Sequence, residues 1–202
     1  EAARSVAANI MRHMAQPRMM TPGQASVREG GWALRAMVGM YLGTGEEIYR
    51  AEAKRLVDLY VGWLAEYGGL LAPYTIHSMP RVVFMISLTV DSFARYLLIA
   101  DDQRVKDLIV RTADDLVEHS LGPDGVPYYK ELPSLRRSAP TPHFLAAMTH
   151  AYRLTGNDRY MKLAARCFAA MDHSGGGAES GPKFLDESGA VIAGSGGGRI
   201  FS

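Results

Sequence analysis

A short segment occurs three times in this chain at nearly constant spacing. Its copies are YLGTGEEIY at residues 41–49, LLIADDQRV at residues 97–105 and YRLTGNDRY at residues 152–160. Alignment of Gly45, Asp101 and Gly156 places the copies 56 and 55 residues apart. A constant period indicates one repeated supersecondary unit. Because each copy lies between two apolar patterns of helical period, the unit is predicted to be a helix hairpin.

The predicted helices are of two kinds that alternate along the chain. One kind is amphipathic: Tyr160, Leu163, Cys167 and Met171 follow helical spacing, with Arg159 and Lys162 on the opposite side. The other kind, best seen at residues 81–99, is apolar nearly all round, as buried helices are. This alternation predicts an all-α fold in which an inner layer of helices is covered by an outer layer.

Seven helices are predicted, at about residues 2–15, 29–43, 46–66, 81–99, 102–119, 141–154 and 158–172. The turns from inner to outer helices are tight, with Gly, Asp or Asn at the helix ends. The connections from outer to inner helices are long, and they all leave the same end of the array: residues 16–28, 66–80, 120–140 and 173–198. Long loops in compact domains are typically functional, so a functional site is predicted at this end.

Composition limits the classes of function. The formal net charge is +1, from 22 basic and 21 acidic side chains, so no basic footprint for nucleic acid is evident. The apolar runs are too short to span a bilayer, which argues against a membrane protein. The single cysteine, Cys167, lies on an apolar helix stripe and is interpreted as a core residue. No cofactor motif and no metal-ligand spacing can be recognised, so we expect neither a cofactor nor a metal.

The turn at residues 152–160, with the Ala-rich stretch at residues 163–166 after it, resembles the six-hairpin (α/α)-toroid superfamily of carbohydrate-active enzymes. Residues 41–53 match the same pattern, whereas the middle copy has Ala100-Asp101 in place of Thr-Gly. The resemblance covers about residues 29–172. It implies a sugar-binding funnel lined by inner-helix N-termini and the long loops. The superfamily includes polysaccharide lyases, glycoside hydrolases and sugar epimerases, so it does not specify the reaction.

The number of helices is smaller than a closed ring of this superfamily requires, which is about twelve. We therefore expect a double-layered α/α hairpin array that forms a partial (α/α) toroid. Residues 1–172 are predicted to be the toroid domain, part of a larger toroid, and residues 173–202 a Gly-rich loop or tail. The ring is expected to be completed by the remainder of a longer chain or by a second copy, with an open array as the alternative.

The loop before the second predicted inner helix carries the strongest candidates for catalysis. Tyr74 and His77 lie three residues apart, and Arg81 opens the helix. In lyases of the resembled superfamily, a Tyr and a His share the proton transfers, and an Arg neutralises the uronate carboxylate. An imidazole titrates near neutral pH and a guanidinium holds a carboxylate through two hydrogen bonds, so the chemistry suits these residue types. The alternative is that Tyr74 packs on helix ends and His77 caps the helix.

Two further segments contribute candidates at the same end. At the start of the first inner helix, Glu29 is a candidate acid or base, Arg28 an anion ligand and Trp32 a sugar-stacking platform. Their alternative roles are helix capping and core packing. Tyr128, Tyr129 and His143 are candidate substrate ligands, with loop packing and capping as alternatives. His150, in mid-helix, is interpreted as a core residue.

The sequence hypothesis is a polysaccharide lyase that acts on a uronate-containing glycan by Tyr/His acid–base β-elimination. A glycoside hydrolase of the same fold and a non-catalytic helical array that binds glycan or protein are the alternatives. The expected partner is a polysaccharide or oligosaccharide substrate, and neither nucleic acid nor membrane is expected. Sequence leaves the compartment open, although the resemblance implies a secreted or periplasmic protein.

Overall fold

The computed structural model describes residues 1–21, 27–67, 81–129, 136–137, 139–172, 183–185, 188 and 191–194. The helices of this part of the chain are α1 (Ala2–Met14), α2 (Pro17–Met20), α3 (Val27–Thr44), α4 (Glu47–Tyr67), α5 (Val83–Tyr96), α6 (Gln103–His119), α7 (Pro142–Thr155) and α8 (Asp158–Asp172). The strands are β1 (Arg136–Arg137), β2 (Lys183–Leu185) and β3 (Val191–Gly194). The fold is essentially all-α, as predicted.

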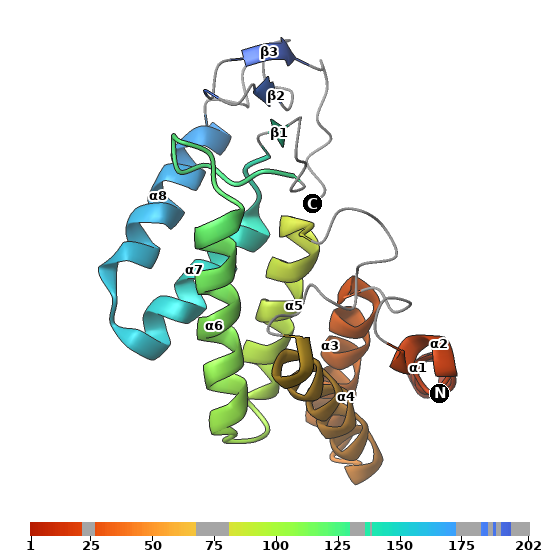
Figure 1. Cartoon of the computed structure of the whole chain (residues 1–202). Coiled ribbons are helices and arrows are strands. Elements are labelled where there is room, and N and C mark those ends of the chain that lie inside the picture. Colours follow the sequence, from red (N-terminus) through yellow and green to blue (C-terminus); the bar gives the residue numbers. More distant parts are fainter. Residues whose placement is uncertain are drawn as a thin grey trace.

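The helices form the two predicted layers. In the inner layer, α5 packs between α3 and α7. In the outer layer, α4 packs on α3, α6 packs on both α5 and α7, and α8 packs on α7, while α1 flanks α3. Figure 1 shows the hairpins following one another in chain order across the molecule. The alternation of apolar and amphipathic helices therefore predicted the layers correctly.

Side-chain burial explains the assignment of each helix to its layer. On outer helix α6, Val105, Leu108, Ile109 and Leu116 are buried along one stripe, and Asp102 caps the first turn by accepting the Arg104 amide at 3.0 Å. Inner helix α5 is buried nearly all round, from Ile86 through Val90 and again at Phe93 and Tyr96. A helix with little polar surface is stable only between other helices.

Two of the three tight turns use glycine in the left-handed conformation. Gly45 has φ 70° and Gly156 has φ 67°, and their amides donate to the carbonyls of Tyr41 and Tyr152 at 2.8 and 2.7 Å. The middle copy has no such glycine, so α5 ends at Tyr96, earlier than expected, and a looser turn leads to α6. The departure of this copy from the sequence pattern thus changes how the inner helix terminates.

The structure adds two elements that sequence periodicity did not predict. Helix α2 has only four residues and begins at Pro17, too short a segment to display a helical period. Strands β1, β2 and β3 form an antiparallel sheet in that order. Two of these strands lie within residues 173–202, which were predicted to be a loop or tail. Figure 1 places the sheet at the long-loop end of the array, beyond α8.

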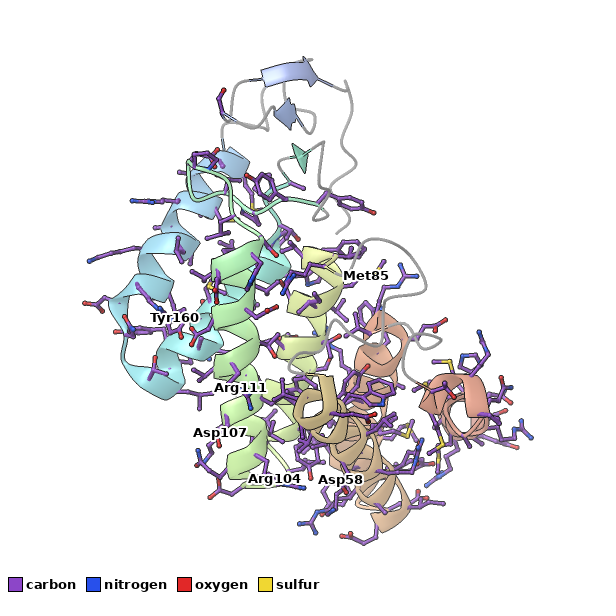
Figure 2. The ribbon with its side chains drawn as sticks, in the orientation of Figure 1. Asp58, Met85, Arg104, Asp107, Arg111 and Tyr160 are labelled. Atoms are coloured by element: carbon purple, nitrogen blue, oxygen red, sulfur yellow. The ribbon has the colours of Figure 1, made fainter. Side chains whose placement is uncertain are left out.

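The opposite end, which carries the tight turns, holds ion pairs between outer helices. Arg104 on α6 contacts Asp58 on α4 at 3.0 Å, and Figure 2 shows both residues there, while Met85 near the start of α5 lies toward the other end. These side chains are substantially exposed, and such pairs contribute little stability. None of the described helices is both long enough and apolar enough to cross a membrane.

Candidate functional site

One side of the inner layer is left open by the outer helices, and we call it the uncovered face. It carries a group of partly exposed polar and aromatic side chains from all three inner helices: Trp32 and Arg35 on α3, Asp91 and Arg95 on α5, and His143 and His150 on α7. On helices that are otherwise largely buried, such a cluster marks a candidate site.

Asp91 lies at the centre of this cluster. Its Oδ1 accepts a hydrogen bond from His150 Nε2 at 2.9 Å, and its Oδ2 lies 3.1 Å from Arg95 Nε and 3.3 Å from Arg35 Nη2. The His150 hydrogen bond, helped by Arg95 and Arg35 and opposed by burial, holds the pKa of Asp91 at about 2. Asp91 is therefore ionised at neutral pH, and it links the three inner helices.

The contact with Asp91 determines which nitrogen of His150 can act as a base. Because Nε2 donates to the carboxylate, the neutral ring carries its proton there and leaves Nδ1 as the basic nitrogen. The side chain is one-fifth exposed, so the ring is reachable. His150 is thus not simply a core residue, as its mid-helix position suggested.

His143 begins α7 and is half-buried. Burial lowers its pKa, and the charges of Asp91 and Arg35 act on it in opposite directions, Asp91 raising and Arg35 lowering it. These electrostatic interactions place His143 in the neighbourhood of the Asp91 cluster. At neutral pH its ring is neutral, because its pKa lies below the usual value of 6.5.

The structure brings Arg28, Glu29 and Trp32 together. All three line a groove of about 550 Å³ between α1 and α3, which we call the α1–α3 groove. Trp32 is 49% exposed, so it is a surface aromatic rather than a core residue. The Arg35 guanidinium lies 5.5 Å from the centre of its ring, in a cation–π contact. Trp32 therefore belongs to both the groove and the uncovered face.

Gly30 and Gly31 allow α3 to pack closely against its neighbours. A Cβ on Gly30 would lie 2.1 Å from the Tyr60 hydroxyl oxygen, and one on Gly31 would lie 2.6 Å from Thr89 Oγ1. Both hydroxyl groups lie 2.9 Å from the carbonyl oxygen of Val27. The first turn of α3, which carries Arg28 and Trp32, is thereby fixed against α4 and α5.

Three other candidates have structural contacts of their own. Arg81 forms an ion pair with Asp115 on α6, with N–O distances of 2.9 and 3.2 Å. Tyr128 is only 2% exposed, so its ring offers no open face to a sugar. Tyr129 is half-buried, and its ring stacks on that of Phe84 at 5.7 Å. These residues cluster around the start of α5, where the Val83 amide donates to the Tyr129 carbonyl.

The candidate acid–base residues Tyr74 and His77 lie outside the described residues. Sequence reasoning also overlooked Arg35 and Asp91. A signal for them exists: they lie 56 residues apart, which is the repeat period, and so occupy matching positions on successive inner helices. Within the described part of the chain, no group of three or more His, Cys, Asp or Glu residues is arranged to hold a metal ion.

Comparison with known proteins finds no matching family model and no matching curated protein. Solved structures do match. A D-mannose isomerase aligns with a TM-score of 0.60 and 12% identity over 82% of this chain and 46% of its own. A glycosyl hydrolase of family 88 from Bacteroides vulgatus aligns with a TM-score of 0.58 and 16% identity over 91% of this chain and 59% of its own.

This chain thus spans about half the length of the solved structures that it matches. Both of those structures are (α/α)-toroid carbohydrate-active enzymes. At such low identity the likeness concerns the fold, and it agrees with the resemblance of the repeated turn. The chain therefore has the fold of the (α/α)-toroid carbohydrate-active enzymes.

Proposed function

We propose that this chain acts on carbohydrate, and specifically that it is a polysaccharide lyase that cleaves a uronate-containing glycan by acid–base β-elimination. The observation that carries the proposal is the Asp91–His150 pair, 2.9 Å apart on the uncovered face and accompanied by Arg35 and an exposed Trp32. This set combines a positioned base, cationic groups and an aromatic platform. The sugar-processing enzymes of the same fold add support.

In the proposed reaction, a base removes the C5 proton of a uronate. The electron pair of that C–H bond forms the C4=C5 double bond, and the C4–O bond to the leaving sugar breaks. The departing oxygen then takes a proton from an acid. An arginine beside the carboxylate makes the C5 proton more acidic by stabilising the charge that develops there. His150 Nδ1 is suited to the base, and Arg35 to the carboxylate ligand.

The charge balance of the cluster favours an anionic sugar. Two guanidinium groups, Arg35 and Arg95, share the single carboxylate of Asp91. These three groups have a net charge of +1, so a substrate carboxylate would balance them. The acid of the reaction is assigned to Tyr74 or His77, the acid–base candidates of the sequence hypothesis.

A glycoside hydrolase is the main alternative, because one of the two matched structures has that activity in its name. Most such enzymes need two carboxyl groups about 5 to 9.5 Å apart, one of which donates a proton. On the described part of this face, Asp91 has a pKa of about 2 and is unsuited to donate a proton at neutral pH. A carboxylate in this state is better suited to orient His150.

The test is a product assay on uronate-containing polysaccharides with purified protein. A lyase generates the ultraviolet absorbance of a 4,5-unsaturated uronate, and a hydrolase generates reducing ends without that absorbance. A third outcome is isomerisation, the activity named for the other matched structure, which would convert an aldose to a ketose without cleaving a glycan. The His150→Gln variant should lower the turnover number about 10²- to 10⁴-fold, as expected for loss of a general acid or base.

His119 on α6 provides the matched control, because it lies on an outer helix with its ring against the Asp115 carbonyl. His119→Gln should retain full activity. His77→Ala tests the sequence hypothesis directly, and comparison with His150→Gln identifies the base. Full activity in His150→Gln would exclude the proposed role of the Asp91–His150 pair. Glycan binding without turnover on any substrate would instead support a non-catalytic array.

A further inference from the structure

The α1–α3 groove is an open hollow of about 550 Å³ on the surface of the described part of the chain. This volume lies in the range of about 300–1,000 Å³ that is typical of small-molecule sites. Asn9 and His13 of α1 face Arg28, Glu29 and Trp32 of α3 across it. The reaction proposed above needs none of the α1 side chains, so the groove calls for a separate explanation.

A chain of side-chain contacts connects the groove lining to the Asp91–His150 pair. Trp32 lines the groove, and the guanidinium of Arg35 lies 5.5 Å from the centre of the Trp32 ring. Arg35 in turn contacts Asp91 at 3.3 Å, and Asp91 accepts from His150 at 2.9 Å. Arg35 and Trp32 therefore link the Asp91–His150 pair to the lining of the groove.

The chemistry of the groove fits an acidic sugar. Trp32 offers an exposed aromatic face, and Ile10 and Met14 add apolar surface. Basic side chains contact two lining residues from outside the groove: Arg12 donates to Asn9, and Arg18 lies 3.4 Å from His13 Nε2. Arg28 is exposed, and no ion pair joins it to another described residue. The groove lining itself carries one guanidinium group, Arg28, and one carboxylate, Glu29, and the two further guanidinium groups contact lining residues of α1.

We propose that the α1–α3 groove is a second sugar-binding subsite, so that the substrate is an acidic oligosaccharide or polysaccharide rather than a free monosaccharide. One sugar unit lies at the Asp91–His150 pair, and a neighbouring unit of the same glycan lies against Trp32 in the groove. This inference rests on the proposed function for the reacting unit. It adds a second binding site for the same glycan.

The test compares two tryptophan substitutions on adjacent residues of α1. Asn9→Trp fills the groove, whereas Ala8→Trp adds the same bulk at an exposed position outside the groove lining. Binding of uronate oligosaccharides from one to six units is measured by titration calorimetry in a His150→Gln background, which prevents turnover. Longer oligosaccharides should bind about tenfold more weakly to Asn9→Trp than to Ala8→Trp, and the monosaccharide should bind equally to both.

Arg28→Gln provides a second variant whose folding is not in question, because the side chain is exposed. It should weaken binding of the longer acidic oligosaccharides about fivefold and leave their neutral counterparts unaffected. Equal affinity of Asn9→Trp and Ala8→Trp for every length would overturn the inference. So would a wild-type affinity that does not depend on length.

The two proposals fail in distinguishable ways. If the wild-type protein forms the unsaturated product while groove variants bind all lengths normally, the subsite is wrong and the lyase stands. If binding depends on length and on the groove but no unsaturated product forms, the subsite stands and the lyase is wrong.

Discussion

At the scale of single residues, Asp91 connects the polar side chains of the uncovered face. It accepts from His150 and pairs with Arg35 and Arg95, side chains from three different inner helices. A carboxylate that neutralises several donors both holds their geometry and stabilises the folded state in its ionised form. Its contribution to folding should therefore depend on pH.

The expected direction follows from the two pKa values of Asp91. Its pKa is about 2 in the folded chain, against a reference value of 3.8. Between these values the unfolded chain binds more protons, so the stabilisation is fully present above pH 5 and is lost as the pH falls through 2. A shift of this size corresponds to about 2 kcal/mol.

Urea unfolding of Asp91→Asn and wild type from pH 7 down to pH 3 measures this contribution. The wild type should be more stable by about 2 kcal/mol at pH 7, and the difference should shrink on acidification. Asp107→Asn is the control, since Asp107 is exposed on α6 and accepts from its helix neighbour Gln103. A difference between wild type and Asp91→Asn that is constant with pH would contradict the assignment.

At the scale of secondary-structure elements, α3 shows which features sequence can predict. Its helical pattern and its place in the inner layer follow from the apolar period, and Trp32 and Arg28 became candidates from their position at its start. The purpose of Gly30 and Gly31 was not recognised, because their neighbours Tyr60 and Thr89 come from other helices. Contacts between distant segments leave no local signal.

Glycine substitutions within α3 test this packing. Gly30→Ala would place a methyl group 2.1 Å from the Tyr60 hydroxyl oxygen, so the free energy of unfolding should fall by about 1–3 kcal/mol. Gly39→Ala is the matched control in the same helix, because a methyl group there would meet no atom within 4 Å. At that position alanine should raise the free energy of unfolding by about 0.5–1 kcal/mol through helix propensity. Equal effects of the two substitutions in chemical denaturation would refute this packing role.

At the scale of the whole molecule, the repeat predicted the two layers and the two unlike ends. The same repeat predicted a functional site at the long-loop end. The polar cluster around Asp91 instead lies along the middle of the inner helices, where Asp91 and His150 meet. In sequence, a single polar residue in the middle of an apolar helix carries no signal of a site, and His150 was therefore interpreted as a core residue. The site becomes visible only when the three helices are packed together.

A ligand that lies across this site contacts several hairpins at once, so its effect on stability should be global. In the His150→Gln background, an acidic oligosaccharide at about 100 times its dissociation constant should raise the free energy of unfolding by about 2.7 kcal/mol. Hydrogen exchange should then slow in α1, α3, α5 and α7 together. Protection limited to one hairpin would contradict a ligand that spans the uncovered face.

The carbonyl oxygen of Val27 has a consequence for the genetics of this protein. It lies within hydrogen-bond distance of the Tyr60 and Thr89 hydroxyl groups, one residue before Arg28. Because these buried contacts fix the first turn of α3, a change as small as Thr89→Val would alter the orientation of the Arg28 and Trp32 side chains. A screen for lost glycan affinity should therefore recover substitutions at Tyr60 and Thr89, two positions that no sugar touches.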